Sequence, residues 1–214
     1  MTDHSQDILA RVSHLKGNQS SQDIYDDWSQ TYDDHLIEKC GYISPTVAAN
    51  ALADANDQRD IARSDIKVID FGCGTGLVGA ALAKRGFNTI DGADISKGML
   101  EQARVKSVYR NLMQIDLTAG TGLVKQCYDA GLCIGSMGAG HVGSRHLPGM
   151  LRSIKPGGLF VIIINGMHYG PEGFDRAFAG FEDKGLWQIK RTESFNYMDN
   201  LDRPGWLVVG EVGG

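Results

Sequence analysis

A short apolar strand that runs into a glycine turn and then into a helix is the feature that most constrains this chain. Residues 68–71 read Val-Ile-Asp-Phe, glycines follow at positions 72, 74 and 76, and an apolar helical stretch runs from Leu77 to Arg85. Glycine lets the backbone turn tightly and approach a ligand, while the first turn of a helix presents unpaired N–H groups. The stretch therefore predicts the first βα unit of a parallel sheet and a binding site for a polar ligand group.

The same alternation continues along the chain and predicts the fold class. Apolar strand patterns and helix patterns alternate in the order expected of a parallel sheet covered by helices on both faces. Two final β-like runs, separated by a turn-rich segment, predict an antiparallel hairpin. We therefore expect a doubly wound α/β fold with a mostly parallel, seven-stranded sheet. Its strands are expected at 68–71, 88–92, 112–115, 127–134, 159–165, 187–195 and 206–212, and its helices at 77–85, 96–105 and 146–154.

Ahead of the first strand, the spacing of large side chains predicts helices. Tyr25, Trp28 and Tyr32 fall three and four residues apart and would share one helical face, either as a packed cap or against a ligand. Ser44 is expected as the N-cap of an alanine-rich helix with Pro45 at its first position. A short helix is also expected near residues 8–15. We divide the chain into an N-terminal helical cap, 1–60, and a core, 61–214, within one structural domain.

Composition narrows the classes of partner. The net charge of -5 offers no basic field for a polyanion, so nucleic acid is not expected. No apolar run approaches the length of a membrane span, and the polar N-terminus does not suit a signal peptide, so a cytoplasmic location is expected. Four cysteines without a C-x-x-C pair indicate neither a disulfide framework nor a metal site.

Two further markers indicate an adenosine cofactor without naming it. Gly74, Gly76 and Gly79 satisfy the dinucleotide fingerprint G-x-G-x-x-G, which a nicotinamide or flavin enzyme would also show. Asp94 follows about 20 residues after the glycine turn, where a carboxylate can accept both ribose hydroxyl protons. The patterns alone leave the cofactor open.

Several motifs in order resemble one enzyme family. The stretch from Asp70 to Gly76 resembles the acidic-x-G-x-G-x-G motif of class I S-adenosylmethionine-dependent methyltransferases, residues 92–104 are similar to their ribose-binding segment, and residues 155–158 to their turn before the fifth strand. The resemblance covers residues 64–165 and implies a Rossmann-like methyltransferase fold, S-adenosylmethionine as cofactor and S-adenosylhomocysteine as product. Residues 25–34 are similar to the cap of methyltransferase-like proteins, in which a cap helix closes over the cofactor.

The resemblance also implies which residues bind the cofactor. The glycine turn would approach the methionine part, Asp70 would orient its amino group and Asp94 would hold the ribose. Asp116 would meet the adenine edge, although a carboxylate that only caps a loop is an equal alternative. The predicted cofactor-binding residues are Tyr25, Trp28, Tyr32, Asp70, Gly72, Cys73, Gly74, Gly76, Asp94, Ile95, Met99, Asp116, Leu117, Gly135 and Ser136.

The acceptor side of the reaction is less defined. His141 is a candidate general base because it follows the fourth strand, but a lone loop histidine is often only solvated. His168 and Tyr169 follow the fifth strand, where loop packing is the alternative. The segment 134–142 is richer in glycine than in many relatives. No Asn or Asp followed by two prolines and an aromatic residue appears there, which together with the acidic charge favours a small-molecule acceptor.

Two other functions remain open at this point. A non-catalytic module could use the same fold to bind S-adenosylmethionine or S-adenosylhomocysteine. An NAD-dependent oxidoreductase would use the G-x-G-x-x-G match, but the sequence has no evident Tyr-x-x-x-Lys pair. The oligomeric state and the acceptor atom are not defined by the sequence.

Overall fold

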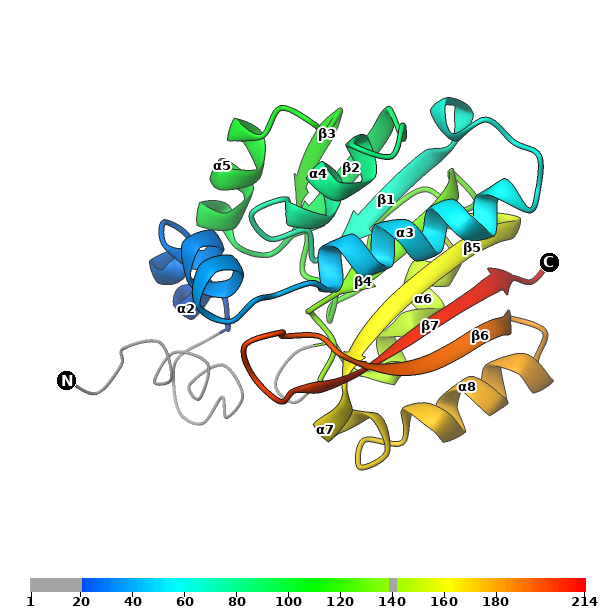
Figure 1. Ribbon diagram of the computed structural model, residues 1–214. Helices are drawn as coiled ribbons and strands as arrows, with labels where there is room; N and C mark the ends of the chain where they lie inside the picture. The colour runs from blue at the N-terminus through cyan, green and yellow to red at the C-terminus, as the bar shows by residue number, and fades with distance from the viewer. Residues whose placement is uncertain (1–20, 139–141) are drawn as a thin grey trace.

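The computed structural model describes residues 21–138 and 142–214, which form one seven-stranded sheet in the order β3-β2-β1-β4-β5-β7-β6 (Figure 1). The predicted helix near residues 8–15 and the candidate His141 lie outside the described residues. The strands are β1 (Lys67–Phe71), β2 (Thr89–Asp94), β3 (Asn111–Gln114), β4 (Tyr128–Ile134), β5 (Ile154–Asn165), β6 (Trp187–Asn196) and β7 (Pro204–Val212).

The predicted, mostly parallel sheet with a C-terminal hairpin is confirmed. β1 pairs in parallel with β2 on one side and β4 on the other, and β4 pairs in parallel with β5. β7 runs antiparallel to both β5 and β6, so it enters the sheet between them and leaves β6 at the edge. The carboxyl ends of the parallel strands therefore share one edge of the sheet, where ligands bind in folds of this class.

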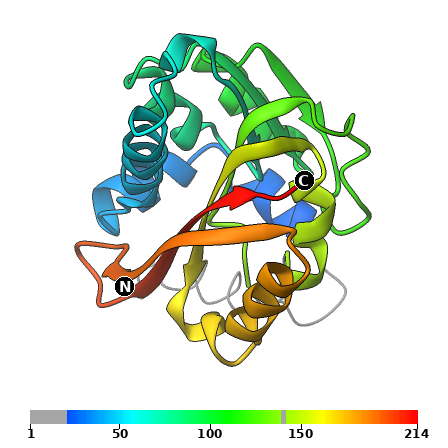
Figure 2. The ribbon, with the colours of Figure 1, turned by 90° about the vertical axis from the view of Figure 1, so that its right-hand side faces the viewer.

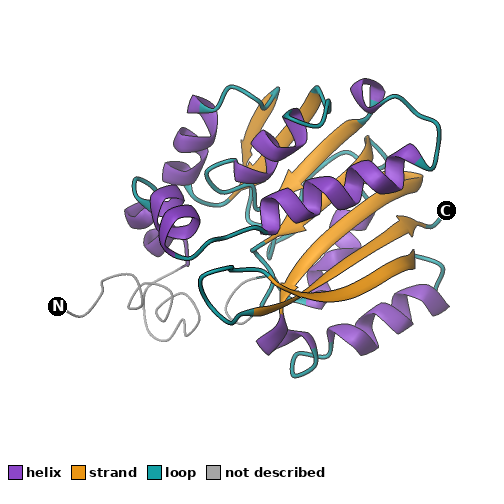
Figure 3. Ribbon diagram, viewed as in Figure 1, coloured by secondary structure: helices purple, strands orange, loops and turns teal. Residues whose placement is uncertain are grey.

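Helices cover both faces of the sheet (Figures 1, 2 and 3). On one face, α3 (Ser44–Asp57) and α4 (Leu77–Ala83) pack with one row of strand side chains into a core cluster that includes Leu52, Val68 and Leu132. On the other face, α6 (Leu147–Leu151) and α8 (Phe174–Asp183) close a second cluster around Phe160. α5 (Lys97–Val105) packs on β2 and β3. No helix of the described ranges is long and apolar enough to cross a membrane.

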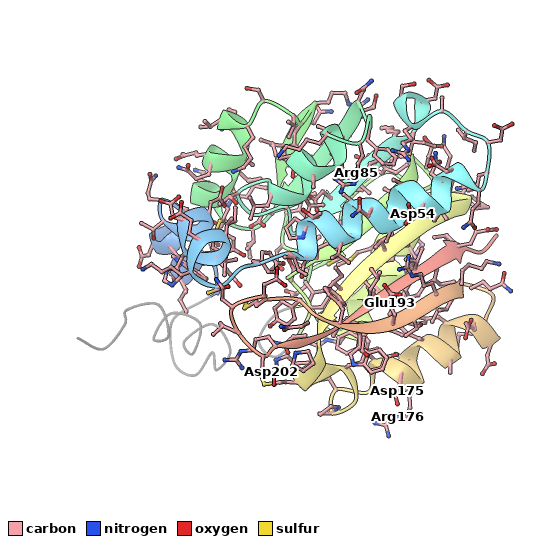
Figure 4. The ribbon with its side chains drawn as sticks, viewed as in Figure 1. Asp54, Arg85, Asp175, Arg176, Glu193 and Asp202 are labelled. Atoms are coloured by element: carbon pink, nitrogen blue, oxygen red, sulfur yellow. The ribbon has the colours of Figure 1, made fainter. Side chains whose placement is uncertain are left out.

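The helix α8 was not predicted from the sequence. Phe174 and Phe178 are buried, one turn apart, whereas Asp175 and Arg176 between them are exposed. Figure 4 shows these two charged side chains pointing away from the sheet. The apolar residues of this segment do sit at helical spacing, but Gly173 and Gly180 flank or interrupt the pattern, which weakens its helix signal.

The helices of the N-terminal region differ in detail from the prediction. The single helix expected through Tyr32 is wrong, because α2 (Ser21–Trp28) ends in a turn and a π-helix, η1 (Asp34–Lys39), follows it. Ser44 is not the N-cap of α3; Ile43 takes that position, and Pro45 lies in the first turn. The division at residue 60 stays a prediction, and within the first part α3 packs directly on the sheet.

The remaining short elements complete the chain. They connect the strands and the longer helices without adding a layer, and two of them lie at the carboxyl edge or next to it. They are η2 (Arg63–Asp65), η3 (Ser144–His146) and α7 (Gly166–Tyr169).

A substitution of Phe160 tests whether the second core cluster stabilises the fold as its packing suggests. Its ring is fully buried, with ring centroids 6.2 Å from Phe71 and 5.7 Å from Trp187. Phe160→Ala should lower the free energy of unfolding by about 3–5 kcal/mol, because it leaves a cavity among rigid aromatic neighbours. Urea denaturation measures the change. Val124→Ala, at a residue that is 73% exposed, is the control and should stay within about 0.5 kcal/mol.

Candidate cofactor site

The glycine turn after β1 has the backbone geometry that its sequence predicts. Gly72, Gly74 and Gly76 have φ angles of 70°, 52° and 90°, a region that other residues rarely adopt. A Cβ at Gly72 would lie 2.0 Å from Ser136 Oγ, so this end of the turn packs against the loop after β4. A Cβ at Gly74 would meet nothing within 4 Å. The turn is therefore closed on the side of Gly72 and open at Gly74.

Asp94, at the end of β2, connects this turn to α5. One carboxylate oxygen accepts a hydrogen bond from the Gly74 backbone N–H at 2.9 Å, and the other accepts one from the Ser96 N–H at 2.9 Å. Ser96 is the N-cap of α5 and its hydroxyl accepts from the Met99 N–H at 3.0 Å. The pKa of Asp94 is raised by burial, against the effect of these backbone bonds. The predicted ribose-binding residue thus also fixes the shape of the glycine turn.

Asp70 is fully buried beneath the turn. The Tyr109 hydroxyl donates a hydrogen bond to Asp70 Oδ2 at 2.7 Å, and the same hydroxyl accepts from the Gly79 N–H at 3.1 Å. Asp70 Oδ1 has no hydrogen-bond partner within the described part of the chain. Burial raises the pKa of Asp70 to about 7, and the Tyr109 hydrogen bond opposes part of that rise. A buried carboxyl oxygen that lacks a partner can accept a hydrogen bond from a ligand group.

Tyr109 explains a glycine that the sequence shares with dinucleotide-binding proteins. A Cβ at Gly79 would lie 2.3 Å from Tyr109 Cζ, and Cβ atoms at Gly76 and Gly92 would approach the same ring to 2.9 Å and 3.0 Å. These three glycines make room for one aromatic side chain under the turn. The third glycine of G-x-G-x-x-G therefore has a packing role here.

Two aspartates of the N-terminal region fasten it to the core around the glycine turn. Asp26 accepts hydrogen bonds from the Ser96 hydroxyl and, at 2.9 Å, from the Gly98 N–H. Asp33 accepts from the Thr75 hydroxyl at 2.5 Å and forms an ion pair with Lys106 at 2.6 Å. Residues 21–43, a shorter segment than the predicted cap of residues 1–60 and called the cap from this point, are thus bound to both the turn and the start of α5.

Aromatic side chains of the cap gather beside these carboxylates. Trp28 is buried and its ring centroid lies 4.6 Å from that of Tyr32, at an angle of 66°. Tyr25 stacks on Trp28 at 6.3 Å. The pKa values of Tyr25 and Tyr32 are raised mainly by burial and further by the charge of Asp94. Both phenols therefore stay protonated and lie in the negative field of Asp94.

The cap is also joined to the C-terminal hairpin, and Figure 1 shows the loop between β6 and β7 beside the chain that enters α3. The Ile43 N–H donates to the Tyr197 carbonyl at 3.1 Å, and the Asp199 N–H donates to the Gly41 carbonyl at 2.9 Å. The Asn200 N–H donates to the Cys40 carbonyl at 3.2 Å. These backbone bonds make the hairpin loop a second wall next to the cap.

Other predicted site residues take different positions. Asp116 is exposed and accepts from the Thr118 N–H and hydroxyl at 2.8 Å and 2.6 Å, which is the loop-capping role considered as its alternative. Leu117 is buried in the core cluster of Phe160. Both follow β3 at the carboxyl edge, and their contact with adenine stays a prediction. Gly135 follows β4, where a Cβ would lie 2.8 Å from the Tyr42 hydroxyl.

Four residues around the site were not predicted from the sequence: Asp26, Asp33, Tyr42 and Tyr109. Asp26 and Asp33 belong to the two Tyr-Asp-Asp sequences at residues 25–27 and 32–34, in which only the tyrosines were predicted to bind the cofactor. Tyr109 lies in the connection between α5 and β3, outside the motifs, so only the glycines that it contacts could have indicated it.

The sheet order and the glycine turn at its carboxyl edge define a Rossmann-like α/β protein. Residues 68–158 match the family model described as "Methyltransferase domain". The chain is 31% identical over 174 residues to the human methyltransferase-like protein 27, across 77% of this chain and 67% of that protein. The chain belongs to the S-adenosylmethionine-dependent methyltransferases, and it is an enzyme of that family.

Solved structures share the fold at low sequence identity. A chain from the complex of the Haloferax volcanii Trm112 methyltransferase activator with a methyltransferase has a TM-score of 0.67 and 18% identity, covering 91% of this chain and 98% of its own. The magnesium protoporphyrin IX methyltransferase of Synechocystis with bound S-adenosylmethionine has a TM-score of 0.57 and 18% identity, covering 99% and 92%. The family model and the human relative confirm the predicted methyltransferase resemblance, and these structures show the same fold.

Asp26 tests whether the cap depends on its bonds to α5. Asp26→Ala removes the acceptor for the Ser96 hydroxyl and the Gly98 N–H, so residues 21–43 should open more often and be cleaved faster by a protease. We expect a rate of cleavage about 5–10 times higher, as for a loss of about 1 kcal/mol of local stability. Asp27→Ala, the exposed neighbour, is the matched control. Equal cleavage of both variants and the wild type would show that these bonds do not hold the cap.

Asp70 predicts a pH dependence of stability. Because its pKa is about 7 in the folded protein and near 4 in the unfolded chain, the folded state binds the proton more tightly, and stability falls as pH rises through that window. Asp70→Asn cannot ionise and keeps an acceptor for Tyr109. The free energy of unfolding of this variant, relative to that of wild type, should therefore rise by about 1–3 kcal/mol between about pH 5 and about pH 8, as urea denaturation measures. Asp54→Asn, on the surface, corrects for effects of pH on the assay; a constant difference between Asp70→Asn and wild type contradicts the prediction.

Proposed function

We propose that this enzyme transfers a methyl group from S-adenosylmethionine to a small-molecule acceptor, with the glycine turn, Asp94 and the aromatic cap as the cofactor site. The observation that carries the assignment of the site is the ring of carboxylates at the glycine turn. Asp94 accepts from the Gly74 N–H, Asp33 from Thr75, and Asp70 is buried below. This is a site for a cationic ligand.

A dinucleotide and S-adenosylmethionine differ in the charge that they bring to the glycine turn. A dinucleotide would bring its pyrophosphate to the first glycine turn, where backbone N–H groups must serve the phosphate oxygens. In this protein the Gly74 N–H already donates to a carboxylate, and the surrounding aspartates would repel the phosphates. S-adenosylmethionine carries an ammonium and a sulfonium instead, so the same aspartates attract it. This favours the methyltransferase cofactor over NAD.

The side chains at the turn fit the parts of that cofactor. Each Asp94 oxygen accepts one backbone N–H, and a carboxylate has lone pairs left for two ribose hydroxyls. Asp70 Oδ1, buried and unpartnered among the described residues, suits the amino group, directly or through a water. Tyr25, Trp28 and Tyr32 offer aromatic faces, which attract a cation.

Methyl transfer then requires mainly that the acceptor atom and the methyl group are held in line. The sulfonium supplies an activated methyl group, so the protein's task is to hold the acceptor in line and to exclude water. The cap and the hairpin loop are placed to exclude water because both lie at the carboxyl edge and are hydrogen-bonded to each other. The acidic net charge supports a small molecule over nucleic acid as the acceptor.

A non-catalytic module that only binds the cofactor is the second candidate. It would use the same glycine turn and Asp94, so binding alone does not distinguish it. Transfer of a labelled methyl group from S-adenosylmethionine to any small acceptor supports the enzyme. Titration calorimetry of the protein with S-adenosylmethionine, S-adenosylhomocysteine and NAD distinguishes the enzyme and the binding module from an oxidoreductase. Binding of NAD alone would overturn the proposed site.

Asp94 tests the cofactor site. Asp94→Ala removes the ribose acceptor and the bond that shapes the turn, so affinity for S-adenosylhomocysteine should fall by about 2–4 kcal/mol. Titration calorimetry measures the affinity, and circular dichroism verifies that the variant is folded. Asp54→Ala, on the exposed side of α3, is the control, and Figure 4 shows its position away from the carboxyl edge. Near wild-type affinity in a folded Asp94→Ala protein would rule out this binding mode.

A further inference from the structure

Two polar side chains pack against the glycine-rich loop after β4, at the carboxyl edge of the sheet. Gly135 has a φ of 76°, and a Cβ there would lie 2.8 Å from the Tyr42 hydroxyl. Gly138 has a φ of 138°, and a Cβ there would lie 2.7 Å from Cδ2 of the His168 ring. Larger residues at either position would collide with these side chains. The unusual glycines of this loop therefore make room for a phenol at one end and an imidazole at the other.

The loop itself is part of the cofactor's surroundings. Ser136 lies between the two glycines, and its hydroxyl is 3.4 Å from the Gly72 carbonyl oxygen, in the glycine turn. His168 belongs to α7, which begins where β5 ends, as Figure 3 shows. The imidazole thus stands at the end of β5 and against the loop that ends β4, on the side of the turn away from Asp94 and β2.

Glu172 fixes which nitrogen of His168 can act as a base. His168 Nδ1 lies 2.8 Å from a carboxylate oxygen of Glu172, one helical turn further along the chain. A carboxylate only accepts hydrogen bonds, so Nδ1 must carry the proton and donate it, and Nε2 of the neutral ring keeps its lone pair. The side chain of His168 is 18% exposed, so the ring is held but still reachable. A base oriented by a carboxylate in this way is a common arrangement for proton removal.

We propose that His168, oriented by Glu172, removes the proton of the methyl acceptor, and that the Tyr42 hydroxyl positions that acceptor from the other end of the loop. The substrate class that follows is a small molecule whose acceptor atom bears a proton at neutral pH, such as a phenol or an alcohol. This inference rests on the proposed function, because it assigns the acceptor half of the same site.

The proposed step balances. The proton of the acceptor O–H moves to Nε2 of His168, and the oxygen lone pair forms the new bond to the methyl carbon. The bond from that carbon to sulfur breaks, and its electron pair remains on the sulfur, which becomes neutral. His168 then releases the proton to solvent. Burial raises the pKa of Tyr42, so its hydroxyl stays protonated and acts as a hydrogen-bond donor instead of a base.

The first test needs no acceptor. Nitrogen NMR of the histidine rings, with His168 assigned from His168→Gln, should show Nδ1 protonated and Nε2 unprotonated in wild type. Glu172→Ala should shift His168 toward the Nε2-protonated form that free imidazole side chains prefer, and S-adenosylhomocysteine should move the His168 resonances in wild type. A ring with Nε2 protonated in wild type, or one that the ligand leaves unmoved, would overturn the proposal.

The second test compares phenol with thiophenol as methyl acceptors. Thiophenol is already ionised at mildly alkaline pH and needs no base, whereas phenol does. His168→Gln should lower kcat for phenol by about 100-fold, a common effect of losing a general base, and change that for thiophenol by about 2-fold at most. His146→Gln, another histidine, is the matched control and should keep both rates. Equal losses for both acceptors would mean that His168 is structural.

The two proposals fail in distinguishable ways. If S-adenosylmethionine does not bind to the wild type by calorimetry, the proposed function falls. If it binds with the same affinity to wild type and to His168→Gln, but wild type methylates only thiophenol or neither probe, the cofactor site stands and the assignment of a protic acceptor is overturned.

Discussion

The hydrogen bonds that Asp94 accepts from Gly74 and Ser96 are the constraint on which the rest of the site depends. They hold the glycine turn in its left-handed conformations and fix the start of α5 beside it. Through Ser96 the same arrangement extends to Asp26, and so to the cap. A single carboxylate at the end of β2 thus connects the turn, a core helix and, through Ser96, the cap. These hydrogen bonds offset part of the desolvation cost of a buried carboxylate at that position.

The carboxyl groups that gather around this point support the proposed selectivity for a cationic ligand. Asp33, Asp70 and Asp94 approach the turn from three different elements, and only Lys106 forms an ion pair with one of them among the described residues. Repulsion between carboxylates is unfavourable in the free protein and is relieved when a cationic ligand enters. The same glycine pattern can therefore serve opposite ligand charges, according to the side chains placed around it.

Much of the fold could be predicted from the sequence, because each strand and most core helices carry a local signal. The run at residues 159–165 is apolar throughout, and the glycines after β1 require a turn. α8 was missed since glycines flank its apolar pattern, and the break between α2 and η1 was missed since the aromatic spacing continues across it. The site was predictable where a motif existed, as at Asp94. His168 was placed after the fifth strand by the sequence, but its contact with Gly138 was not; Tyr109 lies under the turn through neighbours distant in the sequence, such as Gly79, which no local pattern reveals.

The position of β7 between β5 and β6 has a consequence for the order in which the enzyme is completed. The loop that leads into this strand carries the backbone groups that bind residues 40–43 of the cap, about 155 residues earlier in the chain. During synthesis, the cap emerges first but the hairpin loop emerges almost last, so the hydrogen bonds between them can form only when nearly the whole chain is available. Chains that end before the hairpin would keep the bonds of Asp26 and Asp33 but lack those to the hairpin loop, so the cap would open more often in unfinished molecules than in finished ones.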